Sequence, residues 1–389
     1  MKKATIIIPT YNERENIEKT TDALQEVFKK IKNWDMSILV VDDTSPDKTY
    51  NLVKQLQKKN KNLHLVINKQ KAGLGAAYLK GMAYAFGKLK TDVVFEFDAD
   101  LSHDPTKIPL FLNKIDKGYE MVLGSRYIPG GGIPDDWGFH RKFLSVVGNK
   151  VIQIILTNFS IQDWTGGYRA ITKKVYDTIA PEMTGERFSG YTFQVGFLHK
   201  AVNKKFKITE IAFKFKDRTI GQSKIGPEFI INNLIYLLRV RIKEIVASRV
   251  FKFVVVGSIG ALTQLITLQL WRELFSYLVS YILSLICAIT VNFILSNMWT
   301  FVDRKLKPAQ IPIKFVIFFA SSLGSVFIQL GLAALGEKYI GIKPLFIIPI
   351  INYIFDTGLL FAMIGILIGM FWNFFAYSKI VWRVKKTAK

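Results

Sequence analysis

The stretch Phe95-Glu96-Phe97-Asp98-Ala99-Asp100 joins a short apolar run to two carboxylates one residue apart. The apolar run predicts a buried β-strand, and side chains two residues apart on a strand point to the same face. We therefore expect Asp98 and Asp100 to converge where the strand ends. Paired acids can also form a solvated turn, but this pair suits a hard cation, Mg²⁺ or Mn²⁺, which can in turn bind a diphosphate.

Three further apolar and β-branched runs, at residues 5–8, 37–41 and 63–67, precede this strand. Helical patterns at 16–31 and 76–86 separate them. Alternation of strands with helices predicts an α/β fold whose mainly parallel sheet is covered on both faces. Ligands of such sheets bind beyond the carboxyl ends of the strands.

Polar residues follow two of the other predicted strands at this same edge. They are Pro9-Thr10-Tyr11-Asn12-Glu13 and Asp42-Asp43-Thr44-Ser45-Pro46-Asp47. A second acidic pair at a neighbouring strand end strengthens the interpretation of Asp98 and Asp100 as a metal and diphosphate site. We expect the active face at this edge of the sheet.

The chain of 389 residues has 53 Lys+Arg against 30 Asp+Glu, a net charge of +23. Such an excess suits nucleic acid or an anionic membrane surface. Long hydrophobic stretches and the lack of a nucleic-acid motif favour the membrane and argue against nucleic acid. The single cysteine, Cys287, excludes a disulfide within the chain and a cysteine-based zinc site.

Four apolar stretches, at 250–271, 274–299, 313–335 and 358–377, are long enough to cross a bilayer. A further apolar segment at 345–357 would overshoot the bilayer if added to the last stretch, so it is expected to be interfacial or re-entrant.

Basic residues cluster before the first span, after the second and after the fourth, which predicts that both termini and the soluble domain are cytoplasmic. Between the soluble part and the first span, apolar and basic residues alternate. This mixture predicts an amphipathic helix in the membrane interface, although an ordinary core helix remains open. The predicted domains are a soluble α/β domain at 1–225, this helix or linker at 226–248, and a membrane domain of two helical hairpins at 249–389.

The membrane domain contains a weak internal echo. Lys252-Phe253-Val254 opens the first span as Lys314-Phe315-Val316 opens the third, and Asn292-Phe293 recurs late in the fourth span as Asn373-Phe374. Duplication of one hairpin explains the echo, and chance matching between apolar segments is the alternative.

Five ordered motifs within residues 4–225 resemble those of a family 2 glycosyltransferase of the dolichol-phosphate mannose synthase kind. The remainder, with Lys252-Phe253, Asn292-Phe293 and Trp299-Thr300-Phe301, is similar to a GtrA-type four-helix membrane domain. The resemblance implies a GT-A fold for the soluble domain and an all-α transmembrane domain. The five motifs are Ile8-Pro9-Thr10-Tyr11-Asn12-Glu13, Val41-Asp42-Asp43-Thr44-Ser45-Pro46-Asp47, Asp98-Ala99-Asp100-Leu101-Ser102-His103, Gly124-Ser125-Arg126-Tyr127 and Asp217-Arg218-Thr219-Ile220-Gly221-Gln222-Ser223-Lys224.

The family's activity would be transfer of mannose from GDP-mannose to dolichyl or another polyprenyl phosphate, with Mg²⁺ or Mn²⁺ and inversion at the sugar. The resemblance also implies roles for individual residues. The residues implied to bind the nucleotide are Pro9, Tyr11, Glu13, Asp42, Asp98 and Lys224. Those implied to bind the metal are Asp98, Asp100 and Ser102, and at the position of Ser102 some relatives have Gln. Catalysis is implied for Asp100, Arg126 and Arg218, binding of the acceptor phosphate for Arg126, Arg141 and Ser145, and positioning for Asp163.

A site that transfers a sugar to a lipid phosphate does not need a strong general base. A lipid monophosphate has a second pKa of about 6, so at neutral pH it is already largely a dianion and a competent nucleophile. Arginine is suited to bind such phosphates through paired hydrogen bonds. Two alternatives stay open: a UDP-glucose-dependent polyprenyl-phosphate glucosyltransferase, and a carrier or flippase of lipid-linked sugar. A processive polysaccharide synthase is disfavoured because the sequence has no Gln-x-x-Arg-Trp signature.

Overall fold

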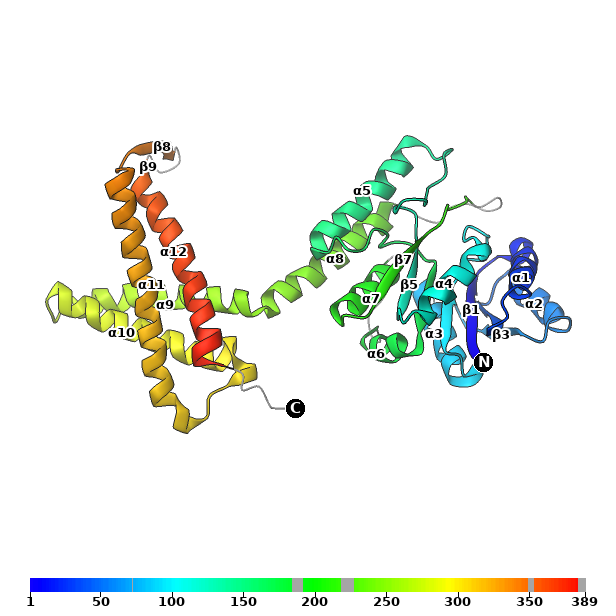
Figure 1. The fold of residues 1–389 in the computed structure, drawn as a ribbon, viewed down its shortest axis with the longest axis horizontal. Helices are drawn as coiled ribbons and strands as arrows, with labels where there is room; N and C mark the ends of the chain where they lie inside the picture. Colours follow the sequence, from blue (N-terminus) through cyan, green and yellow to red (C-terminus); the bar gives the residue numbers. More distant parts are fainter. Residues whose placement is uncertain (72, 184–191, 218–226, 349–352, 384–389) are drawn as a thin grey trace. The chain divides into compact units, whose positions relative to one another are not determined.

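The computed structural model describes residues 1–71, 73–183, 192–217, 227–348 and 353–383. The chain divides into two compact units, Met1–Arg241 and Ile242–Lys389 (Figure 1). Each unit has its own architecture: the first is built on a sheet, and the second on long helices.

The first unit contains a seven-stranded sheet with the order β3-β2-β1-β4-β6-β5-β7. Strands β1 to β4 run parallel to one another, while β6 is antiparallel to both of its neighbours and β7 is parallel to β5. The predicted α/β fold with a mainly parallel sheet is confirmed. The strands are β1 (Lys2–Thr10), β2 (Trp34–Asp42), β3 (Leu63–Ile67), β4 (Val93–Glu96), β5 (Met121–Ser125), β6 (Arg169–Thr172) and β7 (Ile208–Ala212).

Helices cover both faces of this sheet, and the apolar residues of β1 show why. Ile6 and Ile8 belong to the core on one face, whereas Ile7 belongs to the core on the other. A strand buried on both faces reads as a continuous apolar run instead of an alternating one. The helices are α1 (Arg14–Phe28), α2 (Thr49–Gln57), α3 (Leu74–Tyr84), α4 (Ile108–Asp116), α5 (Phe139–Leu156), α6 (Lys173–Met183), α7 (Thr192–Asn203) and α8 (Pro227–Ala247).

The second unit consists mainly of two helical hairpins, α9 (Arg249–Trp271) with α10 (Tyr277–Leu295) and α11 (Ile311–Tyr339) with α12 (Thr357–Ala376). Within the described residues, three helical stretches are long and apolar enough to cross a membrane, and Leu367–Val381 forms a shorter apolar helix. The chain is therefore an integral membrane protein. The three stretches are Arg249–Trp271, Ile282–Thr300 and Pro308–Tyr339.

The segment between α11 and α12, expected to be interfacial or re-entrant, contains a two-stranded antiparallel ribbon of β8 (Pro344–Ile348) and β9 (Tyr353–Asp356). These strands were not predicted, because a short apolar run between two predicted membrane helices cannot be told from a helical or re-entrant segment by its periodicity.

Candidate active site

The carboxyl ends of β1, β2 and β4 lie side by side, because these strands are parallel neighbours in the sheet. After each strand, one residue that is not glycine has a left-handed backbone: Asn12 (φ 60°), Thr44 (φ 53°) and Leu101 (φ 60°). Asparagine tolerates this conformation, but for a β-branched residue such as Thr44 it is strained. Strained backbone of this kind clusters at ligand-binding sites, so this edge is the candidate site.

Asp42, a predicted nucleotide ligand, is fully buried at the end of β2. Its carboxylate accepts hydrogen bonds from Thr10 Oγ1 (2.8 Å), Ser45 Oγ (2.7 Å) and the Ser45 backbone N–H (2.8 Å). The next residue, Asp43, accepts a hydrogen bond from the Gly73 backbone N–H at 3.0 Å. The acidic pair therefore ties the loop after β2 to β1 and to the start of α3.

Three other predicted nucleotide residues, Pro9, Tyr11 and Glu13, lie around the end of β1. Pro9 is in register with Val41 of β2, and Glu13 stands at the start of α1, where its Oε2 accepts a hydrogen bond from Asn16 Nδ2 (2.9 Å). The Lys71 ammonium lies over the ring of Tyr11, 3.9 Å from its centroid. Lys71 was not among the predicted residues, since a surface lysine in a loop has no distinguishing sequence pattern.

Asp98 and Asp100 lie in the turn after β4, which ends at Glu96. The expectation that a strand would hold them on one face is therefore wrong, because the chain leaves the sheet first. His103, which the sequence analysis did not select, orders the turn instead: the Asp98 backbone N–H donates to His103 Nδ1 at 3.1 Å, and His103 Nε2 lies 3.6 Å from Asp98 Oδ2. Asp100 Oδ1 accepts from the Ser102 backbone N–H at 3.1 Å.

His103 is buried and stacks on Tyr168, with ring centroids 4.9 Å apart and planes inclined by 9°. Burial lowers the pKa of the imidazole, although the nearby Asp98 and Asp100 act in the opposite direction. A neutral ring that accepts at Nδ1 carries its proton at Nε2, facing the Asp98 carboxylate. His103 thus holds the backbone of Asp98 by a hydrogen bond, and its Nε2 faces the Asp98 carboxylate.

The oxygens in this turn fit a hard divalent cation. The side chain of Asp98 is 41% exposed, and Ser102 Oγ is buried with no hydrogen-bond partner among the described residues. No group of three or more His, Cys, Asp or Glu side chains suited to a metal occurs in the described part of the chain. Mg²⁺ and Mn²⁺ sites often have one or two carboxylates and complete their shell with water and substrate phosphate, so the two aspartates are sufficient.

A second buried group under this turn was not predicted. Glu96 and Arg169 are opposite each other on β4 and β6, both fully buried, with Oε2 and Nε 4.0 Å apart. Burial raises the pKa of Glu96 to about 7, and the charge of Arg169 acts against that rise. Arg169 also donates to three backbone carbonyls, those of Gly166 (2.8 Å), Gln194 (2.6 Å) and Trp164 (3.0 Å). It therefore fixes the loop that follows Asp163.

Asp163, predicted as a positioning residue, is buried and binds Arg126. Nε of Arg126 donates to Oδ2 at 2.7 Å and Nη2 donates to Oδ1 at 2.8 Å. Burial raises the pKa of Asp163, but the Arg126 charge and the hydrogen bonds outweigh burial and hold the pKa below its ordinary value. Asp163 therefore stays ionised and holds the guanidinium in one orientation.

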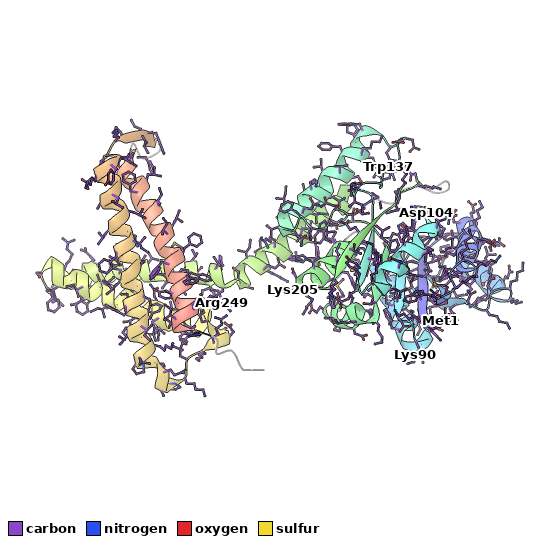
Figure 2. The ribbon with its side chains drawn as sticks, viewed as in Figure 1. Met1, Lys90, Asp104, Trp137, Lys205 and Arg249 are labelled. Atoms are coloured by element: carbon purple, nitrogen blue, oxygen red, sulfur yellow. The ribbon has the colours of Figure 1, made fainter. Side chains whose placement is uncertain are left out.

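The remaining acceptor-phosphate candidates lie on α5. Ser145 Oγ is 2.5 Å from the hydroxyl of Tyr127, the residue after Arg126. Arg141 binds Asp217 through Nη1 at 2.6 Å and stacks on Trp137 at 3.7 Å; Figure 2 labels Trp137, just before α5 begins. The structure thus joins Ser145 to Tyr127, the residue after Arg126, while Arg141 is bound to Asp217.

Two predicted phosphate ligands, Arg218 and Lys224, lie outside the described residues. Next to the site, α5 presents an apolar surface to solvent. Its exposed large apolar residues are Phe139, Phe143, Leu144, Val146, Val147, Val151 and Ile154.

Comparison with known proteins identifies both parts of the chain. Residues 5–180 match Glycosyl transferase family 2, and residues 252–382 match the GtrA/DPMS transmembrane domain. The chain is 35% identical over 226 residues to polyprenol monophosphomannose synthase of Mycolicibacterium smegmatis, covering 58% of this chain and 82% of that protein. It is 32% identical over 307 residues to dolichol-phosphate mannosyltransferase of Pyrococcus furiosus, covering 77% of this chain and 82% of that protein.

Among solved structures, mannosyl-3-phosphoglycerate synthase from Rubrobacter xylanophilus has a TM-score of 0.46 at 14% identity, covering 62% of this chain and 74% of that one.

Proposed function

Because the chain belongs to glycosyl transferase family 2 and to its polyprenyl-phosphate mannosyltransferase branch, we propose that it transfers mannose from GDP-mannose to dolichyl or another polyprenyl phosphate. The observation that carries this proposal is the 307-residue match to the Pyrococcus furiosus enzyme. That match is longer than the whole first unit, Met1–Arg241, so it includes part of the membrane unit as well.

The donor would bind at the edge formed by the ends of β1, β2 and β4. Pro9, Tyr11, Glu13 and Asp42 would surround the nucleoside, with Lys224 on the phosphates. Asp98 and Asp100, with Ser102 as a further candidate, would hold Mg²⁺ or Mn²⁺. A bound cation of this kind neutralises charge on the leaving diphosphate.

The acceptor would attack from the side of Arg126 and Ser145. An oxygen of the lipid phosphate dianion forms a bond to the anomeric carbon as the bond from that carbon to the diphosphate breaks, with inversion and without a proton to remove. Arg126, held by Asp163, would orient the phosphate, and Arg141 and Arg218 would add positive charge around it.

The membrane supplies the second substrate. The exposed apolar faces of α5 and α8 support a catalytic unit that lies on the bilayer surface, since a helix with one apolar face and basic residues on the other binds there. We propose that the catalytic unit and both termini are cytoplasmic; the distribution of Lys and Arg around the spans supports this topology.

The test is an assay of the purified full-length protein with radiolabelled GDP-mannose, polyprenyl phosphate and either Mn²⁺ or Mg²⁺. Chloroform-extractable label that is lost with EDTA is expected. Product from UDP-glucose but not from GDP-mannose would overturn the choice of sugar. Absence of any lipid-linked product, although nucleotide binds, would favour a carrier over a transferase.

A further inference from the structure

The echo between the two hairpins recurs in their secondary structure. Each second helix ends in one π-helical turn, η3 (Ser296–Thr300) after α10 and η6 (Tyr377–Val381) after α12. The second turn begins 81 positions after the first, which is also the separation between Asn292-Phe293 and Asn373-Phe374. A further turn of this kind, η1 (Ala85–Leu89), follows α3 in the first unit. Such turns are rare, and the shared offset of η3 and η6 argues against chance.

The closing hydrogen bonds of the two turns also correspond. The Phe301 backbone N–H donates to the Ser296 carbonyl, and the Trp382 backbone N–H donates to the Tyr377 carbonyl, each at 2.8 Å. Phe301 and Trp382 are again 81 positions apart. The first helices of the two hairpins correspond at an offset of 62 positions, from Lys252-Phe253 to Lys314-Phe315. This offset is 19 shorter than the offset of 81 between the second helices. The second hairpin contains these 19 extra residues between Phe315 and Asn373, at its longer far end, which includes β8 and β9.

The contacts between the hairpins are reciprocal. Phe253 of α9 meets Phe374 of α12, with ring centroids 5.4 Å apart and planes at 75°. The corresponding pair, Phe315 of α11 with Phe293 of α10, has centroids 5.3 Å apart and planes at 78°. In a two-fold interface, when residue i touches the partner's j, residue j touches the partner's i. These two pairs follow this rule within one chain.

A residue next to a two-fold axis contacts the equivalent residue of the other copy, because the axis relates the two. Phe301 and Trp382, equivalent by the offset of 81, stack on each other with centroids 4.5 Å apart and planes inclined by 8°. Both side chains are almost completely buried, at 0% and 1% exposure. This pair marks where the axis passes between the hairpins.

We propose that the membrane unit arose by duplication of one helical hairpin, and that its two hairpins pack as a two-fold pair within the chain. The surface around Phe301 and Trp382 is then the interface through which one copy of the hairpin binds the other copy. Both copies enter the bilayer from the same side, because each begins with a lysine-phenylalanine pair after a basic segment. The axis is then that of parallel repeats, along the membrane normal. This inference does not depend on the transferase activity.

The first test exchanges equivalent residues across the axis in the full-length protein. Trp382 Nε1 donates to Asn297 Oδ1 at 3.1 Å, and the counterpart of Asn297 is Ser378. The exchange variant combines Asn297→Ser, Phe301→Trp, Ser378→Asn and Trp382→Phe. If the two positions are equivalent, the melting temperature of this variant in detergent should lie clearly above that of the half exchange; some loss against the parent is expected, because Asn297 Oδ1 also accepts from the Leu306 backbone N–H at 2.9 Å. The half exchange, Asn297→Ser with Phe301→Trp, should lose about 4 °C or more, because it places two indoles together and removes the acceptor of Trp382.

An exchange variant that melts no higher than the half exchange would overturn the proposal. If neither variant assembles, double-mutant cycles with Phe→Leu decide. The cycles Phe253 with Phe374 and Phe293 with Phe315 should show non-additive melting shifts of similar size. The cycle Phe253 with Phe315, two equivalent residues away from the axis, should be additive. Coupling in only one of the two reciprocal cycles would contradict a two-fold arrangement.

Discussion

The carboxylate of Asp163 and the guanidinium of Arg126 form two parallel hydrogen bonds, and the Arg126 backbone N–H donates to the same carboxylate at 3.1 Å. Thr165 Oγ1 accepts a further hydrogen bond from Arg126 Nη2 at 2.7 Å. Asp163 and Thr165 belong to one loop, and Arg126 follows β5. The pair therefore joins the two segments that surround the proposed acceptor phosphate.

Asp163→Asn should lower turnover at least about tenfold and destabilise the first unit by about 3–5 kcal/mol, because it leaves a buried guanidinium without its counter-charge. Steady-state kinetics and thermal melting measure the two effects. Asp177→Asn is the control, since Asp177 forms an exposed ion pair with Lys173. Normal turnover in Asp163→Asn would remove Asp163 from the positioning role.

Asp100→Ala should abolish lipid-linked product by removing one of the two carboxylates proposed to hold the cation. Mn²⁺ binding, followed by electron paramagnetic resonance in the presence of GDP, should weaken in parallel. Asp22→Ala is the matched control, because Asp22 is exposed on α1. Unchanged Mn²⁺ affinity in Asp100→Ala would show that the cation is held elsewhere.

Arg169→Lys should raise the KM for polyprenyl phosphate at least about tenfold while it leaves the Kd for GDP and Mn²⁺ within about twofold. Lysine keeps the charge but cannot donate to three carbonyls in the planar geometry of arginine. Hydrogen exchange should increase at residues 163–167. Arg239→Lys, at an exposed position of α8, is the control. An equal loss of donor and acceptor binding would indicate general destabilisation instead of positioning.

Glu96 should make the protein less stable as the pH rises. Its pKa is about 7 in the folded chain against an ordinary 4.5, so the folded state binds more protons than the unfolded state between these values. The resulting stabilisation is complete below about pH 4.5 and is lost as the pH rises through about 7. Glu96→Gln cannot titrate, so the difference in melting temperature between Glu96→Gln and the parent should change across this range. A difference that is constant from pH 5 to pH 8 would contradict the raised pKa; Glu18→Gln is the exposed control.

The elements that depend on local pattern could be predicted from the order of amino acids. β1 and the helices α9, α10, α11 and α12 were predicted within a few residues, because burial on both faces of a sheet or in a bilayer imposes continuous apolar runs. The acidic residues that follow β2 and β4 also indicated the edge of the sheet that carries the candidate site.

Which of these residues contact one another depends on the folded arrangement of the chain. His103 binds Asp98, Arg169 of β6 faces Glu96 of β4, and Arg126 binds Asp163. The pairing of β6 between β4 and β5 creates the last two contacts, and no local period encodes that order of strands. The stacking of Phe301 on Trp382 likewise requires both hairpins to be folded against each other. Contacts between distant segments depend on how the elements pack, and for that reason the sequence alone could suggest the duplication without distinguishing it from chance.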